Sequence, residues 1–217
     1  MTAIIFDLDG TLIHSTPDLQ EAVNRMLAEE SVQPLDEATI ESFVGNGLHK
    51  LVERVIEFVD LELHRLGELS ARVLAHYNAV NGQKTVLYPG AADCLATLSA
   101  NGFRLGICTN KPESPARKVL EHFELADLFP VIVGGDTLPV RKPDPELLYH
   151  CADQLGAPRA EVVYVGDSEV DEATARNAGV PFALYTKGYR KKPAGDFETV
   201  LAFDDFAELA AWLGQRA

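Results

Sequence analysis

The stretch AIIFDLDGTL, residues 3–12, joins a short apolar run to two acidic residues and a glycine. The apolar run predicts a buried strand, and the glycine predicts a turn where that strand ends. Side chains two residues apart on an extended chain point the same way, so Asp7 and Asp9 are expected to project together. Neighbouring carboxylates repel, so they bind a cation, share a proton, or both. The alternative interpretation is a plain acidic turn.

Short apolar runs alternate with helical patterns along most of the chain. The expected strands are Ala3–Phe6, Phe103–Cys108, Val131–Val133, Val162–Val165 and Phe182–Tyr185, and the expected helices cover about 113–122, 144–155 and 170–178. Such alternation implies right-handed crossovers and a largely parallel α/β sheet. An edge strand over 199–203 and an amphipathic helix over 206–213 are expected to close this core.

Residues 15–84 interrupt the alternation and are expected to be helical throughout. Thr16-Pro17-Asp18 is a favourable helix start, because it offers a hydroxyl cap, an early proline and a negative charge near the helix N-terminus. Apolar residues then recur at helical spacing over 19–27 and 48–59, and a third helix is expected over about 61–80. The predicted organisation is a core of residues 1–14 and 85–217 with a helical insertion, residues 15–84.

Composition limits the classes of partner. The 217 residues are 47% hydrophobic and carry a formal charge of -14, which argues against nucleic-acid or anionic-membrane binding. Three widely spaced cysteines form no metal-binding pattern and indicate reduced thiols, so a cytoplasmic location is expected. We also expect no signal peptide and no membrane span, because no apolar run is long enough.

Three further polar motifs follow in order, and each could also be an ordinary turn or helix cap. Thr109-Asn110 follows an expected strand and offers a hydroxyl and an amide that can donate to a phosphoryl group. Lys142 lies in a loop that two prolines restrict. Asp167 follows another expected strand, and Asp171 lies one helical turn further on.

These motifs and their order resemble those of the haloacid dehalogenase-like (HAD) phosphatases, whose first motif reads D-x-D-G-T. The helical insertion resembles the cap of their phosphoglycolate phosphatase branch, so the resemblance covers nearly the whole chain. It implies a Rossmann-like parallel sheet with helices on both faces and an all-helical cap. It also implies a Mg²⁺-dependent phosphatase for a small phosphate monoester, above all 2-phosphoglycolate.

The resemblance also implies roles for the first motifs. Asp7 would attack phosphorus and form an aspartyl-phosphate, and Asp9 would act as general acid and then general base. Thr109 and Lys142 would complete the catalytic set. Phosphate and substrate contacts are expected from Gly10, Thr109, Asn110, Lys142, Asn46 and Arg54.

A magnesium site is implied as well. Asp7 and Asp167 would bind Mg²⁺ together with the backbone carbonyl of Leu8, with the Asp9 side chain further out. Asp171 would lie in the outer sphere, where it orients a water molecule or Lys142. Arg54 is the first candidate to bind a second negative charge on the substrate, and His49 and Lys50 are the next candidates.

One departure from the branch and several alternatives stay open. His14 stands where these enzymes usually carry Asp, beside the expected hinge at Ser15 and Lys84. The alternatives to a phosphoglycolate phosphatase are an enzyme for another metabolite such as a sugar phosphate, a β-phosphoglucomutase-like phosphotransferase, and a non-catalytic phosphate-binding regulator. The chain is expected to be a monomer or homodimer.

Overall fold

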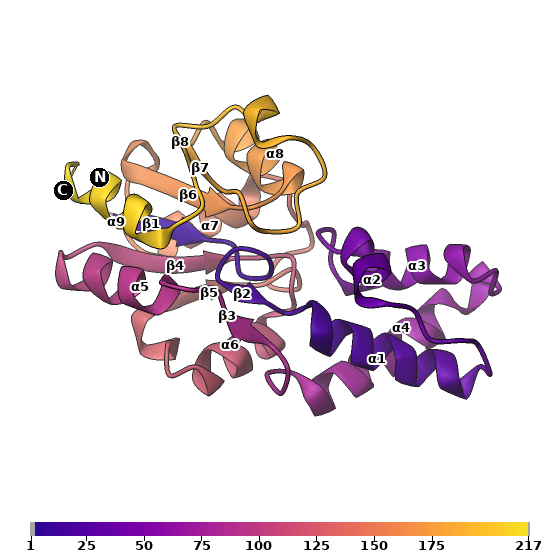
Figure 1. The fold of residues 1–217 in the computed structure, drawn as a ribbon. Helices are drawn as coiled ribbons and strands as arrows, with labels where there is room; N and C mark the ends of the chain where they lie inside the picture. Colours follow the sequence, from indigo (N-terminus) through magenta and orange to yellow (C-terminus); the bar gives the residue numbers. More distant parts are fainter. Residues whose placement is uncertain (1–2, 217) are drawn as a thin grey trace.

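The computed structural model describes residues 3–216, and within them a parallel six-stranded sheet forms the centre (Figure 1). Its order is β5-β4-β1-β6-β7-β8. The strands are β1 (Ala3–Phe6), β4 (Arg104–Cys108), β5 (Val131–Val133), β6 (Val162–Gly166), β7 (Phe182–Tyr185) and β8 (Leu201–Phe203). The strand that carries the first acidic motif therefore lies between β4 and β6, with Ile4 opposite both Leu105 and Val163.

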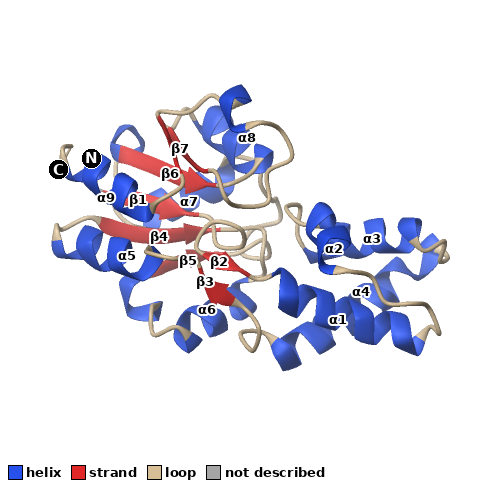
Figure 2. Ribbon diagram, in the orientation of Figure 1, coloured by secondary structure: helices blue, strands red, loops and turns tan. Residues whose placement is uncertain are grey.

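Helices cover both faces of this sheet, as Figure 2 shows. They are α5 (Ala91–Ala100), α6 (Glu113–His122), α7 (Glu146–Gln154), α8 (Glu169–Ala178) and α9 (Phe206–Gly214). The central strand alternates between the two apolar layers: Ile4 and Phe6 pack with α5, α6 and α9, whereas Ala3 and Ile5 pack with α7 and α8. The predicted α/β fold class is thus confirmed.

Four helices fill most of the interrupting segment and lie beyond the carboxyl ends of the strands (Figure 1). They are α1 (Thr16–Glu29), α2 (Glu37–Phe43), α3 (Leu48–Phe58) and α4 (Leu66–Val80). Their apolar faces form a third core of their own, which includes Val23, Val52 and Val73. We call residues 16–80 the helical segment. Its division from the rest of the chain as a separate domain stays a prediction.

A buried carboxylate ties the two crossings between the sheet and the helical segment. Asp18, in the first turn of α1, accepts hydrogen bonds from the backbone amides of Gly82, Lys84 and Thr85 and from the Thr85 hydroxyl, at 2.6–3.1 Å. A short antiparallel pair, β2 (Ile13–His14) and β3 (Val86–Leu87), lies beside them. The entry and exit of the helical segment are therefore held together by one side chain.

Several elements differ from the expectations. Helix α5 and the pair β2–β3 were not predicted, and the last strand begins at Leu201 instead of residue 199. Helix α2 lies in the segment expected to be helical, but no bounds were predicted for it. The Thr199 hydroxyl donates to the carbonyls of Phe182 and Leu201, so its backbone turns before the strand begins. Short 3-10 turns also occur at Leu63–Arg65, Ala126–Leu128, Arg159–Glu161 and Ala194–Asp196. None of the helices within residues 3–216 is long and apolar enough to cross a membrane.

Candidate active site

Three adjacent strand ends bring the main sequence motifs together. Asp7 follows β1, Thr109 follows β4 and Asp167 follows β6, and these strands are neighbours in the sheet. The Asp7 amide still donates to the Val165 carbonyl at 2.8 Å, so the parallel ladder continues up to the acidic residue. Because parallel strands end at one edge, residues far apart in sequence share one site there.

Three carboxylates form the centre of this site. Oxygen atoms of Asp7, Asp167 and Asp171 all lie within 4.8 Å of one another, and all three residues are buried. Burial and the nearby carboxylates raise the pKa of Asp7 to about 7 and that of Asp167 well above its usual range. Three buried acids at this spacing repel one another strongly unless cations compensate them.

One lysine supplies part of that compensation. The Lys142 ammonium lies 2.6 Å from Asp171 Oδ1 and 3.0 Å from Asp7 Oδ1, and it donates to the Tyr164 hydroxyl at 2.8 Å. Burial would raise the pKa of Asp171, but Lys142 and the neighbouring donors outweigh it and lower that pKa. The same carboxylates raise the pKa of Lys142 against the effect of burial, so the lysine stays charged.

Asp171 has its position fixed from two sides. The Ser168 hydroxyl and amide donate to Asp171 Oδ2 at 2.5 and 3.0 Å, within a capping box at the start of α8. Its other oxygen faces Lys142. Ser168 is thus the helix cap, and Asp171 makes the expected contact with Lys142.

Asp167 is held from the opposite side by the first motif. The Thr11 hydroxyl donates to Asp167 Oδ1 at 2.8 Å, and the Tyr189 amide donates to Oδ2 at 2.6 Å. Gly10 has φ +86°, and a Cβ atom there would come within 2.5 Å of Asp167 Oδ2. The glycine is thus required for the close approach of the turn to this carboxylate.

Asp7 retains an oxygen atom that the protein leaves without a hydrogen bond. Among the described residues, the buried Oδ1 atom has only its ion pair with Lys142. Buried carboxylate oxygens normally have hydrogen-bond partners, so this atom is available to a ligand. An all-oxygen donor set with net negative charge fits Mg²⁺.

The Leu8 carbonyl is not free to act as the Mg²⁺ ligand that was predicted from the sequence. It accepts the amides of Thr11, Leu12 and Ile13 at 2.9–3.2 Å, so its lone pairs are used inside the turn. In contrast, none of the hydrogen bonds among residues 3–216 uses the backbone carbonyl of Asp9. The Leu8 carbonyl is thus occupied within the turn, whereas the Asp9 carbonyl is left open among the described residues.

Two clefts open at the acidic centre, and both include Asp7 and Asp9. One, with a cavity volume of about 50 Å³, is lined on the side of the helical segment mainly by apolar residues, among them Leu19, Leu51 and Tyr77. The other, with a cavity volume of about 460 Å³, extends past Asp167 towards Lys191. The site thus lies between the strand ends and the helical segment, with access for a small molecule.

Comparisons with known proteins agree with this geometry. The family described as haloacid dehalogenase-like hydrolase matches residues 4–185. The chain belongs to this family. A phosphoglycolate phosphatase from Rhodospirillum rubrum is 46% identical over 220 residues, covering 98% of this chain and 90% of that protein. One from Psychrobacter arcticus is 38% identical, covering 97% and 94%.

Solved structures of this family share the fold of the hydrolase. A predicted phosphoglycolate phosphatase from Haemophilus somnus superposes with a TM-score of 0.92 at 30% identity, covering 98% of each chain. A second, from Lactobacillus delbrueckii, gives a TM-score of 0.83 at 26% identity, again over 98% of each chain. The predicted family membership is confirmed.

Asn110 has a different set of partners from the one expected. Its amide group donates to the carbonyls of Gly45 and Lys142 at 3.2 Å, and its Oδ1 accepts the Lys142 amide at 3.0 Å. The side chain therefore joins the loop after α2 to the lysine loop. Thr109, which is buried directly after β4, keeps a hydroxyl close to the acidic centre, and its role as a phosphate ligand stays a prediction.

Arg54 and Asn46 contact each other. Arg54 Nη2 donates to Asn46 Oδ1 and Nη1 donates to the Phe43 carbonyl, both at 2.7 Å. Asn46 lines the wider cleft, whereas the guanidinium holds the loop that carries Asn46. His49 accepts or donates a hydrogen bond with Ser70, and Lys50 pairs with Glu53, so neither is directed at the acidic centre by these contacts.

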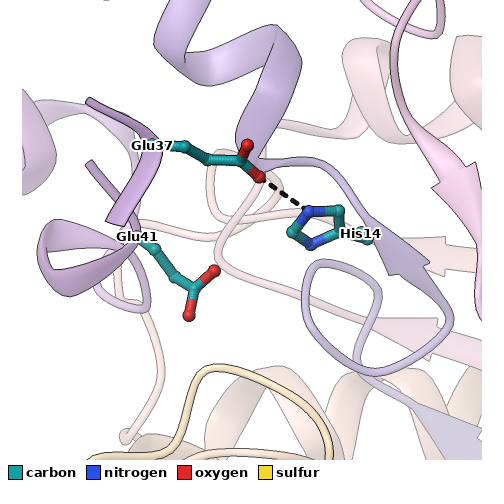
Figure 3. Close-up of side chains that lie close together, drawn as sticks. All are labelled: His14, Glu37 and Glu41. Carbon is teal, nitrogen blue, oxygen red and sulfur yellow. Dashed lines mark hydrogen bonds and ion pairs between the residues drawn. The ribbon is translucent and has the colours of Figure 1, made fainter. Parts of the chain in front are cut away.

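His14 connects the sheet side of the hydrolase to α2 (Figure 3). Its Nε2 atom lies 2.8 Å from Glu37 Oε1, and Glu41 lies close by on the same helix. Its Nδ1 atom lies 3.3 Å from the Tyr189 hydroxyl, which also accepts the amides of Ser15 and Thr16. His14 thus lies at the crossing, as its sequence position predicted.

Lys111 is a charged residue at the site that the sequence motifs did not predict. Its ammonium is buried, lies 2.8 Å from Asp9 Oδ1 and also contacts the Tyr77 hydroxyl. In the sequence, Lys111 precedes a proline and is typical of a surface turn. Its place immediately after Thr109-Asn110, at a strand end, was the available signal.

Proposed function

We propose that this hydrolase is a Mg²⁺-dependent phosphatase that converts 2-phosphoglycolate to glycolate and phosphate through an aspartyl-phosphate. The observation that carries the proposal is the buried Asp7 oxygen without a hydrogen bond, at the centre of three carboxylates and one lysine. The relatives named phosphoglycolate phosphatase support the substrate, since they match along nearly the whole chain. A cytoplasmic location fits the three free, buried cysteines.

The metal would be held by Asp7, Asp167 and the Asp9 carbonyl, with Asp171 outside the first shell. When bound, Mg²⁺ would offset the repulsion between these carboxylates and a phosphate dianion. Asp171 and Lys142 already pair with each other, which leaves Asp7 and Asp167 as the carboxylates with raised pKa values. The metal would therefore bind where the protein leaves negative charge uncompensated.

The reaction divides between two carboxyl groups. Asp7 Oδ attacks phosphorus, the P–O bond to the leaving alkoxide breaks, and Asp9 delivers the proton that the alkoxide needs. Asp9 then takes a proton from the water that attacks the aspartyl-phosphate, which releases phosphate and restores Asp7. During both steps the Lys142 ammonium offsets negative charge on the phosphoryl oxygens, and the Thr109 hydroxyl donates a hydrogen bond to them.

The apolar wall of the smaller cleft favours a compact leaving group over a large one. Its lining from the helical segment includes Leu19, Val44, Leu48 and Leu51. A sugar phosphate needs more room than the two-carbon glycolate group, and none of these apolar side chains offers a partner to its several hydroxyl groups. This lining favours the small ester over the sugar-phosphate and phosphotransferase alternatives.

Phosphate release tests the proposal. Wild type should hydrolyse 2-phosphoglycolate with Mg²⁺ and not in EDTA. After a short incubation and acid quench, Asp7 should carry label from substrate labelled in its phosphate group, and no label from substrate labelled in its glycolate group. Asp7→Asn should abolish turnover and labelling, and Asp167→Ala should raise the Mg²⁺ concentration needed. Asp127→Asn, an exposed carboxylate far from the site, is the matched control.

Full activity in EDTA would overturn the metal assignment, and normal activity of Asp7→Asn would overturn the nucleophile. A higher kcat/KM for a sugar phosphate than for 2-phosphoglycolate, measured under the same conditions, would reject the substrate while leaving the chemistry in place.

A further inference from the structure

Lys111 is a buried cation that the proposed chemistry does not use. Its backbone is fixed to the core, because its carbonyl accepts the Gly135 amide at 2.9 Å. Its ammonium donates to Asp9 Oδ1 at 2.8 Å and to the Tyr77 hydroxyl. A lysine has four rotatable carbon bonds and three donors, so a buried one is held in place only when several partners fix it.

Tyr77 supplies the second anchor from the helical segment. It lies in α4, is 2% exposed, and packs in the apolar core of the four helices. The Lys111 ammonium also lies 4.7 Å from the centre of the Tyr77 ring, within range of a cation–π contact. The tyrosine therefore holds the lysine by both its hydroxyl and its ring.

The Asp9 carboxylate depends on this lysine for its direction. Within residues 3–216, Lys111 is the only side chain that donates a hydrogen bond to it. Asp9 forms an isolated bridge with Ile13, and its side chain is only 17% exposed, so the Lys111 ammonium is the polar contact that sets the direction of its carboxylate. A general acid must lie within hydrogen-bond reach of the leaving oxygen, and small displacements cost rate.

We propose that Lys111 and Tyr77 are positioning residues that aim the Asp9 carboxyl at the leaving group, so that proton delivery depends on helix α4. This inference rests on the proposed phosphatase function. The two residues act only in the protonation of the leaving group by Asp9. The attack of Asp7, which pairs with Lys142, does not require them.

The leaving group distinguishes this role from a structural one. Glycolate leaves as an alkoxide and needs a proton, whereas p-nitrophenolate is a weak base and leaves without one. A misdirected Asp9 should therefore slow phosphoryl transfer from 2-phosphoglycolate and spare transfer from p-nitrophenyl phosphate. A general loosening of the site should slow both.

The test is Tyr77→Phe, which keeps the ring and removes only the hydroxyl. Single-turnover phosphorylation is measured with Mg²⁺ on both substrates, beside Tyr149→Phe as a matched control, since Tyr149 lies in α7 away from the site. We expect a loss of about tenfold or more on 2-phosphoglycolate, within the range that acid catalysis contributes, with KM nearly unchanged. The loss on p-nitrophenyl phosphate should stay below about twofold.

A double variant completes the test. In an Asp9→Asn background, Tyr77→Phe should cause no further loss on 2-phosphoglycolate, because both changes remove the same proton transfer. Lys111→Gln should show the same substrate dependence as Tyr77→Phe. Circular dichroism and urea unfolding verify that each variant is folded.

Equal losses on both substrates would overturn the inference and assign Tyr77 to packing. A change confined to KM would also overturn it and make Lys111 a contact for the substrate itself. A wild type that releases phosphate from neither substrate would instead reject the proposed function, so the two failures are distinguishable.

Discussion

Replacing Asp7 by asparagine should stabilise the metal-free protein near neutral pH although it abolishes turnover. Burial raises the pKa of Asp7 from its ordinary value of 3.8 to about 7, with a further contribution from Asp171 and an opposing one from Lys142. A folded-state pKa above the unfolded value means that the folded protein holds this proton more tightly. The corresponding stability is present below about pH 4 and is lost as the pH rises through about 7.

The size of the effect follows from that shift. At about 1.4 kcal/mol per pKa unit, a rise from 3.8 to about 7 corresponds to on the order of 4 kcal/mol at high pH. Asparagine cannot ionise, so the variant avoids this loss, but it gives up the contact with Lys142 at 3.0 Å. We expect the variant to be about 2–4 kcal/mol more stable than wild type at about pH 8, and nearly equal at about pH 4.

Urea unfolding in EDTA, followed through the single tryptophan, measures this difference at the two pH values. Asp127→Asn is the control for an exposed carboxylate. Saturating Mg²⁺ should restore wild type and leave Asp7→Asn little changed, since a ligand stabilises only the state that binds it. The reasoning would be refuted if the difference between wild type and variant were the same at both pH values, or if wild type were the more stable at pH 8.

Three further substitutions test features around the site. Asp18→Asn should lower the free energy of unfolding by about 1–3 kcal/mol and speed amide exchange at Lys84, because the new side-chain NH2 group faces a backbone N–H donor. Unchanged exchange would contradict the view that Asp18 holds the two crossings together. Arg54→Ala should raise KM for 2-phosphoglycolate more than for a neutral aryl phosphate, whereas equal losses would show that Arg54 only supports the loop of Asn46. His14→Asp places a carboxylate opposite Glu37, so it should change KM or substrate range with the single-turnover rate within several-fold; a large fall in that rate with unchanged binding would place His14 in the catalytic centre.

The sheet could be predicted because its strands are short apolar runs between polar turns. Val131–Val133 and Phe182–Tyr185 match the expected bounds, and a proline directly precedes each of them. Helix α5 was missed because it has only ten residues, and the alanines on its exposed face weaken the contrast with its buried face. The pair β2–β3 has two residues in each strand, too few for any periodicity.

Site residues could be predicted where a motif directly follows a strand. Contacts with side chains of the helical segment could not. The carboxylates of Asp7, Asp167 and Asp171 meet as expected, because the parallel order brings their strand ends together. Lys111 was overlooked since its partner, Tyr77, lies in the helical segment and no spacing relates the two. The contact between Arg54 and Asn46 depends on a loop whose course the sequence does not determine.

The central place of β1 in the sheet has a consequence for synthesis on the ribosome. This strand is made before both of its partners, β4 and β6, so its two edges stay open until those strands emerge. The four helices of residues 16–80 draw their core from their own segment and can fold in the meantime. The nascent chain is therefore expected to carry a folded helical body and an unpaired apolar strand at once, the state most in need of a chaperone.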